Sequence, residues 1–411
     1  MNANPGRRQR RAAHRYLRRV AAALCAVALP ALAACADSGA GASQAGSTAG
    51  LTIGSVDLSK VCPAKVVIQT DWNPQAEQGG LYQLLGPNPV LDDARKQVRG
   101  PLYAKGEWTG VEVEIRSGGP AIGNQSVAVE MYTDPDILLG WVNTDEAVQN
   151  SAEHPVTQVF ATFDKAPWMI MWDPGTYPGV STIKELGKAG ATVRYFDGAT
   201  WMDYLIGNSI LRRDQVDGSY DGSPATFLAA GGKAAQQGFA TVEPYLYRNE
   251  LPQWHKPVAY QLISDTGYPL YAVALSVRSR DVTAQSACLS ALIPVVQQST
   301  VDYFAHPEPA NRLIIKAVDA FDNGWVYTAG QAADSAKSQL TTGVVSNGGN
   351  GTLGDFDGNR VQTILDITTP ILTRNGTAPA DRLKATDLFT NRFLDPGIGL
   401  GTTGAADSPE D

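Results

Sequence analysis

The residues best suited to bind a small molecule stand together shortly after the first apolar run of the folded part. Asp71, Trp72, Asn73 and Gln75 present an indole ring beside a carboxylate and two amides. An aromatic face can stack on a flat solute while polar groups orient it by hydrogen bonds. The alternative is structural, with Trp72 in a core and Asp71 capping a helix.

A strand, a loop and a helix should position this segment. The run from Val66 to Ile68 is apolar and β-branched, which favours a strand buried on both faces of a parallel sheet. Leu81, Leu84 and Leu85 then recur at helical spacing until Gly86 ends the pattern. Loops at the carboxyl ends of strands are where open α/β sheets bind ligands, so this loop is a predicted ligand site.

Further candidates occupy similar places later in the chain. They lie at or near the ends of predicted strands or in segments that cross between lobes, where rigid aromatic faces could line a cleft. Part of the tryptophans could equally be core. These candidates are Trp141, Trp168, Trp201, Glu243 and Tyr245.

The rest of the chain alternates strands and helices, which indicates the α/β class. Thr200 and Asp203 stand three apart like a capping box, and the helix N-terminus they open could hold a polar ligand edge. About 350 residues exceed what one core usually holds, so two lobes are expected. Predicted strands lie at 111–115, 137–142, 156–163, 168–172, 192–196, 237–241, 260–263 and 270–277, with crossings near Pro167 and 265–267 and helices towards the C-terminus.

The N-terminus indicates export. Residues 1–34 contain seven arginines and no acidic residue, followed by an apolar segment from Val20 to Leu32. The sequence Leu32-Ala33-Ala34-Cys35 resembles the lipobox of bacterial lipoproteins, in which the cysteine is lipidated. A plain secretory signal with an incidental Cys35 is the alternative. The small-residue tract that follows predicts a flexible tether over 35–60.

Charge and cysteine usage agree with that compartment. Without residues 1–34 the chain has 26 basic and 41 acidic residues, a net charge near −15 that disfavours nucleic acid as a partner. No later stretch has 18 consecutive apolar residues. Cys62 and Cys288 remain in the folded part, and in an oxidising exterior a disulfide between them is favoured over two free thiols.

Signals of catalysis are missing from the sequence. His154, His255 and His306 are widely spread, which predicts no zinc site, and no G-x-S-x-G elbow occurs. The segment 355–359 hints at a calcium loop, but the required glycine and glutamate are absent. We therefore predict a binding protein with no enzyme activity, no cofactor and no metal.

Motifs along the chain resemble a known family. Asp71-Trp72-x-Pro74 followed by Gly80-Leu81-Tyr82 is similar to the D-W-x-P-N-x-x-H-x-G-L-Y opening of the thiamine-pyrimidine-synthesis-like branch of type II periplasmic binding proteins, relatives of the sulfonate, nitrate and taurine binding subunits of ABC importers. The resemblance extends to about Phe304. Gln75 and Gln78 replace the family's Asn and His, so the ligand is expected to differ. The branch's cysteine-rich segment is absent, and its enzyme activity is not carried over.

The resemblance implies a two-lobed type II periplasmic binding protein fold with a hinge and a mainly helical C-terminal extension. The expected divisions are a signal peptide at 1–34, a tether at 35–60, lobe 1 at 61–164 and 268–400, lobe 2 at 165–267 and a disordered tail at 401–411.

The resemblance also implies roles for individual residues. Trp72 would stack on the ligand, Asp71 and Gln78 would hydrogen-bond it, and Thr200 and Glu243 would meet it from lobe 2. The full candidate set adds Tyr82, Trp141, Trp168, Trp201 and Tyr245.

The implied function is the solute-binding subunit of an ABC importer, anchored by lipid on the outer face of the cytoplasmic membrane. It would capture a pyrimidine or thiamine-precursor type of nitrogen heterocycle and, as a monomer, deliver it to permease and ATPase subunits. The alternatives are a sulfonate, nitrate or related small organic solute, or an exported enzyme on the same fold.

Overall fold

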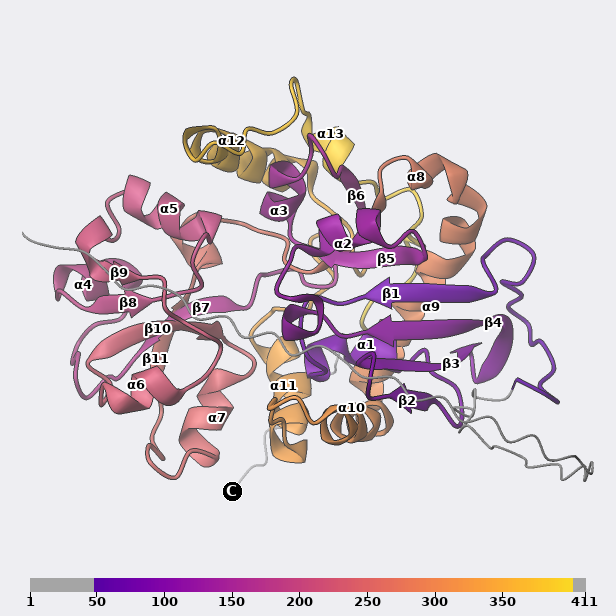
Figure 1. The fold of residues 1–411 in the computed structure, drawn as a ribbon, viewed down its shortest axis with the longest axis horizontal. Coiled ribbons are helices and arrows are strands. Elements are labelled where there is room, and N and C mark those ends of the chain that lie inside the picture. The colour runs from indigo at the N-terminus through magenta and orange to yellow at the C-terminus, as the bar shows by residue number, and fades with distance from the viewer. Residues whose placement is uncertain (1–47, 402–411) are drawn as a thin grey trace, which may run out of the picture. The chain divides into compact units, whose positions relative to one another are not determined.

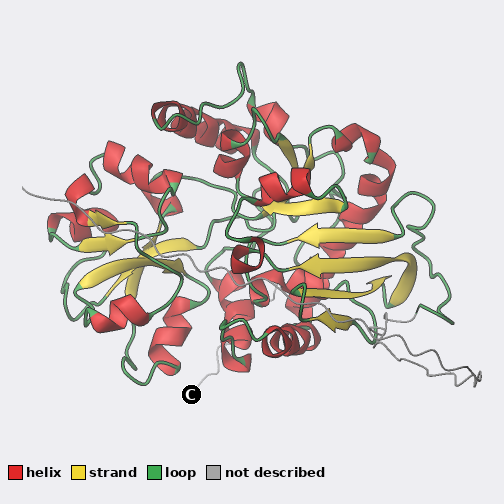
Figure 2. Cartoon of the chain, viewed as in Figure 1, coloured by secondary structure: helices red, strands yellow, loops and turns green. Residues whose placement is uncertain are grey.

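The computed structural model describes residues 48–401, which form two β-sheets with helices around them (Figures 1 and 2). The predicted signal peptide, the lipidation site Cys35, the first part of the tether and nearly all of the predicted tail lie outside the described residues.

The first sheet contains the strand that carries the candidate site. Its strand order is β2-β3-β4-β1-β5-β12-β6, and the central β1 runs parallel to both β4 and β5. Val66, Val67 and Ile68 are buried, which confirms the predicted double-sided burial of this strand. The strands are β1 (Lys65–Gln69), β2 (Val90–Asp92), β3 (Gln97–Ala104), β4 (Glu107–Arg116), β5 (Ile137–Val142), β6 (Val156–Phe160) and β12 (Ala274–Arg278).

The second sheet is inserted between β6 and β12. Its order is β11-β7-β10-β8-β9, with β7 (Trp168–Trp172), β8 (Thr192–Arg194), β9 (Val216–Asp217), β10 (Ala234–Phe239) and β11 (Ala259–Leu262). The chain therefore crosses between sheets twice, through 161–167 and 263–273, the segments that contain Pro167 and residues 265–267. We call the part built on the first sheet lobe 1 and the part built on the second sheet lobe 2.

Helices connect the strands and dominate the C-terminal region. Leu289, Leu292, Ile293 and Val296 on α9 are buried in the main core, as their spacing predicts. No helix within residues 48–401 is both long and apolar enough to cross a bilayer. The helices are α1 (Gly79–Tyr82), α2 (Val127–Thr133), α3 (Thr144–Gln149), α4 (Ile183–Lys188), α5 (Thr200–Gly207), α6 (Ala225–Ala229), α7 (Glu243–Asn249), α8 (Asp281–Ala284), α9 (Ser286–Ala305), α10 (Glu308–Phe321), α11 (Ala329–Thr341), α12 (Gly358–Arg374) and α13 (Ala385–Leu388), with short 3-10 turns η1 (Ala76–Gln78), η2 (Gly119–Ile122), η3 (Arg213–Gln215) and η4 (Ser264–Thr266).

Two local predictions are wrong. The polar, proline-containing segment after Gly86 was not predicted to form strands, yet it contains β2 and β3. Strand β3 accommodates Pro101 where its register against β4 shifts, between Pro101 and Tyr103. Thr200 is not a cap: it is the first helical residue of α5, whose N-cap is Ala199, and no side-chain cap bond forms there.

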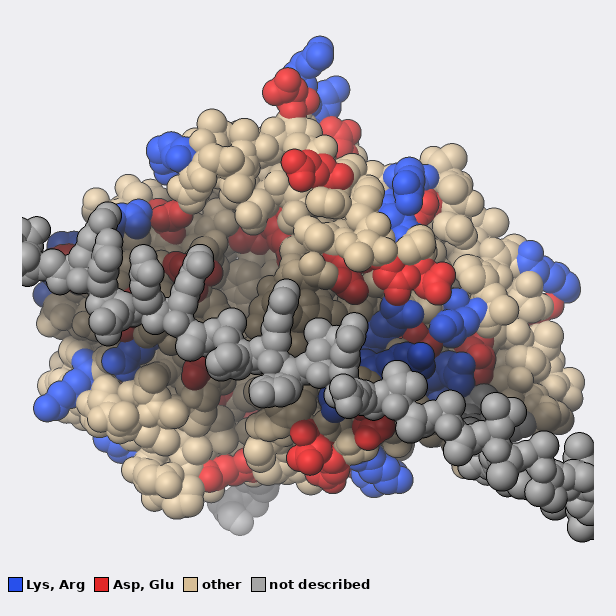
Figure 3. Space-filling view, in the orientation of Figure 1, with Lys and Arg blue, Asp and Glu red and all other residues tan. Residues whose placement is uncertain are grey.

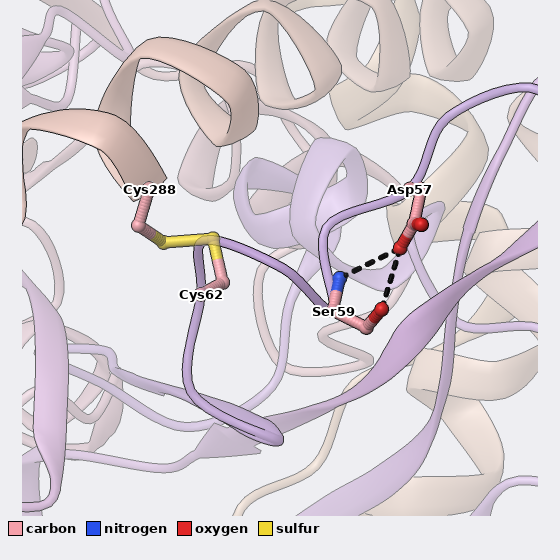
Figure 4. Close-up of a disulfide and its surroundings, with 4 residues drawn as sticks. All are labelled: Asp57, Ser59, Cys62 and Cys288. Carbon is pink, nitrogen blue, oxygen red and sulfur yellow. Dashed lines mark hydrogen bonds between the residues drawn. A yellow bond between two sulfur atoms is a disulfide. The ribbon is translucent and has the colours of Figure 1, made fainter.

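The segment before β1 is tied to lobe 1. Leu58 is fully buried and the backbone N–H of Gly54 donates to the carbonyl oxygen of Trp108 on β4, so this end of the expected tether is part of the folded domain. Cys62 and Cys288 form a disulfide with a Cα–Cα distance of 4.6 Å, as predicted (Figure 4). The bond joins the entry to β1 to the start of α9, 226 residues later.

Replacing both cysteines by serine should destabilise the protein without changing its fold. The disulfide closes a very long loop, and losing such a crosslink typically costs about 2–5 kcal/mol of unfolding free energy. Denaturant unfolding of the Cys62→Ser/Cys288→Ser variant checks this, with the reduced wild-type chain as the comparison. An unfolding midpoint equal to that of the oxidised wild-type chain would contradict the expectation.

Candidate functional site

The loop after β1 is held by its own neighbours. The Thr70 hydroxyl donates to the carbonyl oxygens of Trp72 (3.1 Å) and Arg116 (2.9 Å), and the N–H of Gly118 donates to the carbonyl oxygen of Trp72 (3.0 Å). The Gln78 amide nitrogen donates to the carbonyl oxygen of Asn73 (2.9 Å) from a position that is 1% exposed. Gln78 thus supports the loop from beneath.

The Trp72 side chain lies between the two lobes. Its ring meets Phe196 of lobe 2 edge-on at 6.0 Å and Trp325 of the C-terminal region at 6.1 Å. A Cβ added to Gly119 would come within 2.7 Å of the ring, and one added to Gly222 of lobe 2 within 3.2 Å. Both glycines have positive φ, so a turn and a close approach require glycine at both positions. Trp72 is half-buried, so part of its side chain remains exposed to solvent.

Lobe 2 contributes two aromatic rings and a carboxylate, and one of the rings, Phe196, contacts Trp72. Phe196 follows β8, its N–H donates to Gln237 Oε1 (3.0 Å), and its ring contacts Tyr220 at 4.8 Å. Glu243 is the first residue of α7, and its Oε2 accepts from the N–H of Phe239 (2.6 Å). The Tyr220 hydroxyl lies beside Glu243, and burial together with that carboxylate raises the pKa of the phenol. Phe196, Tyr220 and Glu243 thus form a connected set.

The carboxylates of the site hold their protons unusually strongly. Burial, then the neighbouring Glu146 and Glu77 carboxylates, raise the pKa of Asp71 to about 7. Burial, and more weakly Glu77, raise the pKa of Glu243 to about 7. Burial and Asp145 likewise raise the pKa of Glu146 on α3 to about 7. Figure 3 shows acidic side chains beside the hollow on this face, whereas lysine and arginine side chains gather over β3 and β4.

Glu77 joins the site loop to lobe 2 and to the C-terminal helices. Its Oε1 accepts from the hydroxyls of Thr241, which follows β10, and of Ser335 on α11 (3.0 Å). Its Oε2 is buried without a partner, as is the Thr162 hydroxyl, and both residues line a cavity of about 20 Å³. That volume suits a single water, which would satisfy both atoms. Burial raises the pKa of Glu77.

Replacing Glu77 by alanine should lower the unfolding free energy by about 2–4 kcal/mol, because the buried hydroxyls of Thr241 and Ser335 lose their shared acceptor. Glu77→Gln is the matched control: it keeps the accepting oxygen and should stay within about 1 kcal/mol of wild type. Denaturant unfolding measures both. Equal destabilisation by the two variants would contradict this role of the oxygen.

The structure brings together only part of the predicted set. Asp71 precedes Trp72 in the loop of lobe 1, Glu243 of lobe 2 is connected to Trp72 through Tyr220 and Phe196, and Gln78 lies beneath the loop. No described ring contact or hydrogen bond within residues 48–401 joins the others to the Trp72 side chain. Of these, Tyr82, Trp141, Thr200 and Trp201 are buried, Trp168 begins β7 and is half-buried, and Tyr245 on α7 lies against Gly330 of α11.

Sequence reasoning missed four residues of the site. Phe196 and Tyr220 end segments of lobe 2, Trp325 lies in a turn between α10 and α11, and Glu77 lies six residues after Asp71. Only Phe196 carried a signal, since it stands at the end of a predicted strand. Among residues 48–401, no group of three or more His, Cys, Asp or Glu side chains is arranged to hold a metal ion.

Comparisons with known proteins add to this geometry. No protein-family model matches the chain, and no curated protein matches it by sequence. Among solved structures, the periplasmic aliphatic sulphonate binding protein SsuA from Escherichia coli superposes with a TM-score of 0.52 at 14% identity, over 79% of this chain and 92% of that chain.

Two further structures resemble the chain less well. The alkanesulfonate-binding protein SsuA from Xanthomonas axonopodis pv. citri, bound to MOPS, gives a TM-score of 0.49 at 12% identity over 80% of this chain and 99% of that one. The periplasmic nitrate-binding protein NrtA from Synechocystis PCC 6803 gives 0.48 at 12% identity over 80% and 87%. At such identities the E. coli match establishes the architecture alone: the chain has the two-lobed type II periplasmic binding protein fold.

Proposed function

We propose that the chain is the extracytoplasmic solute-binding subunit of an ABC importer, a binding protein without catalytic activity. The observation that carries the proposal is the position of Trp72, a half-buried ring of lobe 1 that lies against Phe196 and Gly222 of lobe 2. A ring in that position is covered when the lobes approach and uncovered when they separate. Hinge closure around a solute uses such a wall. We take 61–164 with 268–400 and 165–267 as the two closing units.

The solute we propose is a small nitrogen heterocycle of the pyrimidine or thiamine-precursor type. Trp72 and Phe196 offer flat apolar faces for a ring. Asp71 and Glu243 offer carboxylate oxygens that accept hydrogen bonds from an exocyclic amine and a ring N–H. Gln78 orients the loop, since its amide is engaged with the backbone of that loop.

A sulfonate or nitrate is the second candidate, because the E. coli structure of the same fold is named as a sulphonate binding protein. The carboxylates of this site weigh against an anion: Asp71 and Glu243 lie on opposite lobes, and a bound anion would meet both.

A solute panel tests the proposal. Thermal unfolding of the purified full-length chain is followed with thiamine, 4-aminopyrimidine, taurine or sodium nitrate added. We expect stabilisation by a heterocycle, since a ligand that binds the folded state raises the midpoint as its concentration exceeds its Kd. Stabilisation by taurine or nitrate alone would select the second candidate. No stabilisation by any of the four would contradict the proposal.

An exported enzyme on this fold is distinguished by turnover. The stabilising solute is incubated with the protein and recovered by mass spectrometry. Quantitative recovery of unchanged solute supports a binding protein. Conversion of the solute at more than one equivalent per protein molecule would identify an enzyme instead.

The N-terminal motif extends the proposal to the membrane. Lipidation of Cys35 would tether a monomer to the outer face of the cytoplasmic membrane, beside permease and ATPase subunits that accept the solute. One acyl-modified terminus keeps the folded domain close to its permease while the small-residue tract allows it to reorient.

The variant Cys35→Ser should lose this anchorage. With no thiol to carry lipid, the chain should appear in the medium or remain unprocessed, whereas the wild-type chain fractionates with membranes. Immunoblotting of membrane and medium fractions measures the distribution. Cys288→Ser serves as a control that removes a cysteine outside the motif. Membrane association of Cys35→Ser equal to wild type would rule out lipidation at this residue.

A further inference from the structure

The carboxylates around Trp72 lack the basic partners that several other carboxylates of this protein have. Glu114 on β4 bonds Lys65 at 2.8 Å and Arg116 at 2.7 Å. Asp173 bonds Lys256 at 2.9 Å and Asp164 bonds Arg360 at 3.1 Å, whereas the buried Asp145 accepts from the Tyr268 hydroxyl and forms no ion pair within residues 48–401. A charged side chain is usually buried only where an oppositely charged partner offsets its loss of hydration.

Asp71 departs from that pattern. Among residues 48–401, no lysine, arginine or histidine forms an ion pair with Asp71, Glu77, Glu146 or Glu243. No donor from another described residue is hydrogen-bonded to the Asp71 carboxylate, and the charged groups that act on it, Glu146 and Glu77, are both acidic. The site therefore contains several acidic groups and, among residues 48–401, no basic side chain paired with them.

The aromatic rings supply a second, independent feature. The Trp325 ring lies 6.1 Å from Trp72 at 90°, and the Phe196 ring lies 6.0 Å from it at 66°. Phe196 in turn contacts Tyr220 at 4.8 Å. The faces that these rings leave free are electron-rich. Such faces attract a cation, most strongly when water is excluded.

We propose that the solute bound at Trp72 is a cation, with Asp71 of lobe 1 and Glu243 of lobe 2 as its counter-charges. This deepens the proposed function, on which it rests. A neutral ring would use the aromatic faces but leave both carboxylates without a counter-charge. A cation uses both features and draws carboxylates of opposite lobes towards one charge, so that binding favours the closed state.

Glu77 strengthens the charge argument. Glu77 is 4% exposed and forms no ion pair with a basic side chain within residues 48–401. It acts electrostatically on both Asp71 and Glu243. An anionic solute beside Trp72 would therefore add to the repulsion among these carboxyl groups, whereas a cationic one would relieve it.

Three probes of one size isolate the effect of charge: benzylammonium, benzyl alcohol and benzenesulfonate. Binding to the full-length chain is measured by calorimetry at pH 8. We expect benzylammonium to bind at least tenfold more tightly than benzyl alcohol, and benzenesulfonate more weakly than either. In the Asp71→Asn/Glu243→Gln variant the preference for the cation over the alcohol should fall at least tenfold. Asp93→Asn, which removes an exposed acid of the β2–β3 turn, should keep the preference.

The outcomes distinguish the cation proposal from the proposed solute-binding function on which it rests. Tighter binding of benzenesulfonate than of benzylammonium would overturn the cation assignment and leave a solute-binding protein. A preference for the cation that survives in the double variant would also overturn it, because the charge would then be recognised elsewhere. If none of the probes and no member of the solute panel binds, both proposals fail. Thermal melting of the variants confirms that they are folded.

Discussion

Trp72→Ala should weaken binding of the stabilising solute about a hundredfold, or about 2.7 kcal/mol, while the protein stays folded. Trp72 is the ring that both lobes reach: Gly119 and Gly222 approach it from the two sides, and Phe196 and Trp325 pack edge-on against it. Removing the indole takes away a stacking face and opens the site to water at once. The fold survives because the apolar core lies elsewhere, along β1 and α9.

Two matched variants sharpen this test. Trp72→Phe keeps an aromatic face and should retain part of the affinity. Trp108→Ala removes a half-buried tryptophan from the start of β4, whose indole N–H donates to the carbonyl oxygen of Val111, and should leave binding unchanged. Calorimetry gives the affinities and circular dichroism the folded fraction. Wild-type affinity in Trp72→Ala would remove Trp72 from the site.

The elements around Trp72 could be predicted because their signals are local. A β-branched run between polar segments becomes the central β1, buried on both faces by parallel neighbours. The pairing of Cys62 with Cys288 followed from the expected compartment and the cysteine count, not from geometry. Strand β3 could not be found in the same way, since Pro101 is tolerated only because the register shifts beside it.

The binding site was less predictable, since exposure of a side chain depends on packing between distant segments. Trp141 and Trp201 follow the same sequence pattern as Trp72, yet β5 and α5 bury them at 2% and 1% exposure. Trp325 reaches the site only because the chain between α10 and α11 returns to the loop after β1, where its indole N–H donates to the carbonyl oxygen of Pro74 (3.2 Å). No local pattern encodes such a contact.

The raised pKa values of the site carboxyl groups should make the protein more stable at pH 5 than at pH 8. In the folded chain the pKa values of Asp71, Glu146 and Glu243 are about 7, against ordinary values near 4. Between those values the folded state binds more protons than the unfolded state, so the unfolding free energy falls as pH rises. This stability is fully present below pH 4 and is lost by the time pH passes 7.

Carboxyl groups with lowered pKa values affect the stability of the protein in a different pH range. Hydrogen bonds from Ser223 lower the pKa of Asp221, and those from Ser219 lower that of Asp217. The stability these groups contribute is present above their ordinary pKa and is lost only as pH falls below about 4. Between pH 5 and pH 8 the carboxyl groups with raised pKa values therefore dominate, the site carboxylates and Asp145 among them, and we expect the melting temperature to fall by about 5 °C or more across that range.

If the site carboxyl groups cause this pH dependence, replacing them should reduce the change in melting temperature between pH 5 and pH 8. Asp71→Asn/Glu243→Gln should raise the melting temperature at pH 8 and reduce the difference between pH 5 and pH 8, because amides do not titrate. Asp93→Asn should keep the wild-type slope. A bound cation should act like the amides at pH 8, since it offsets the same repulsion that protonation removes, and benzylammonium should therefore stabilise the wild-type chain more at pH 8 than at pH 5. A wild-type chain that melts at a higher temperature at pH 8 than at pH 5 would show that the carboxylates around Trp72 are compensated within the protein, and the need for a cationic solute would disappear.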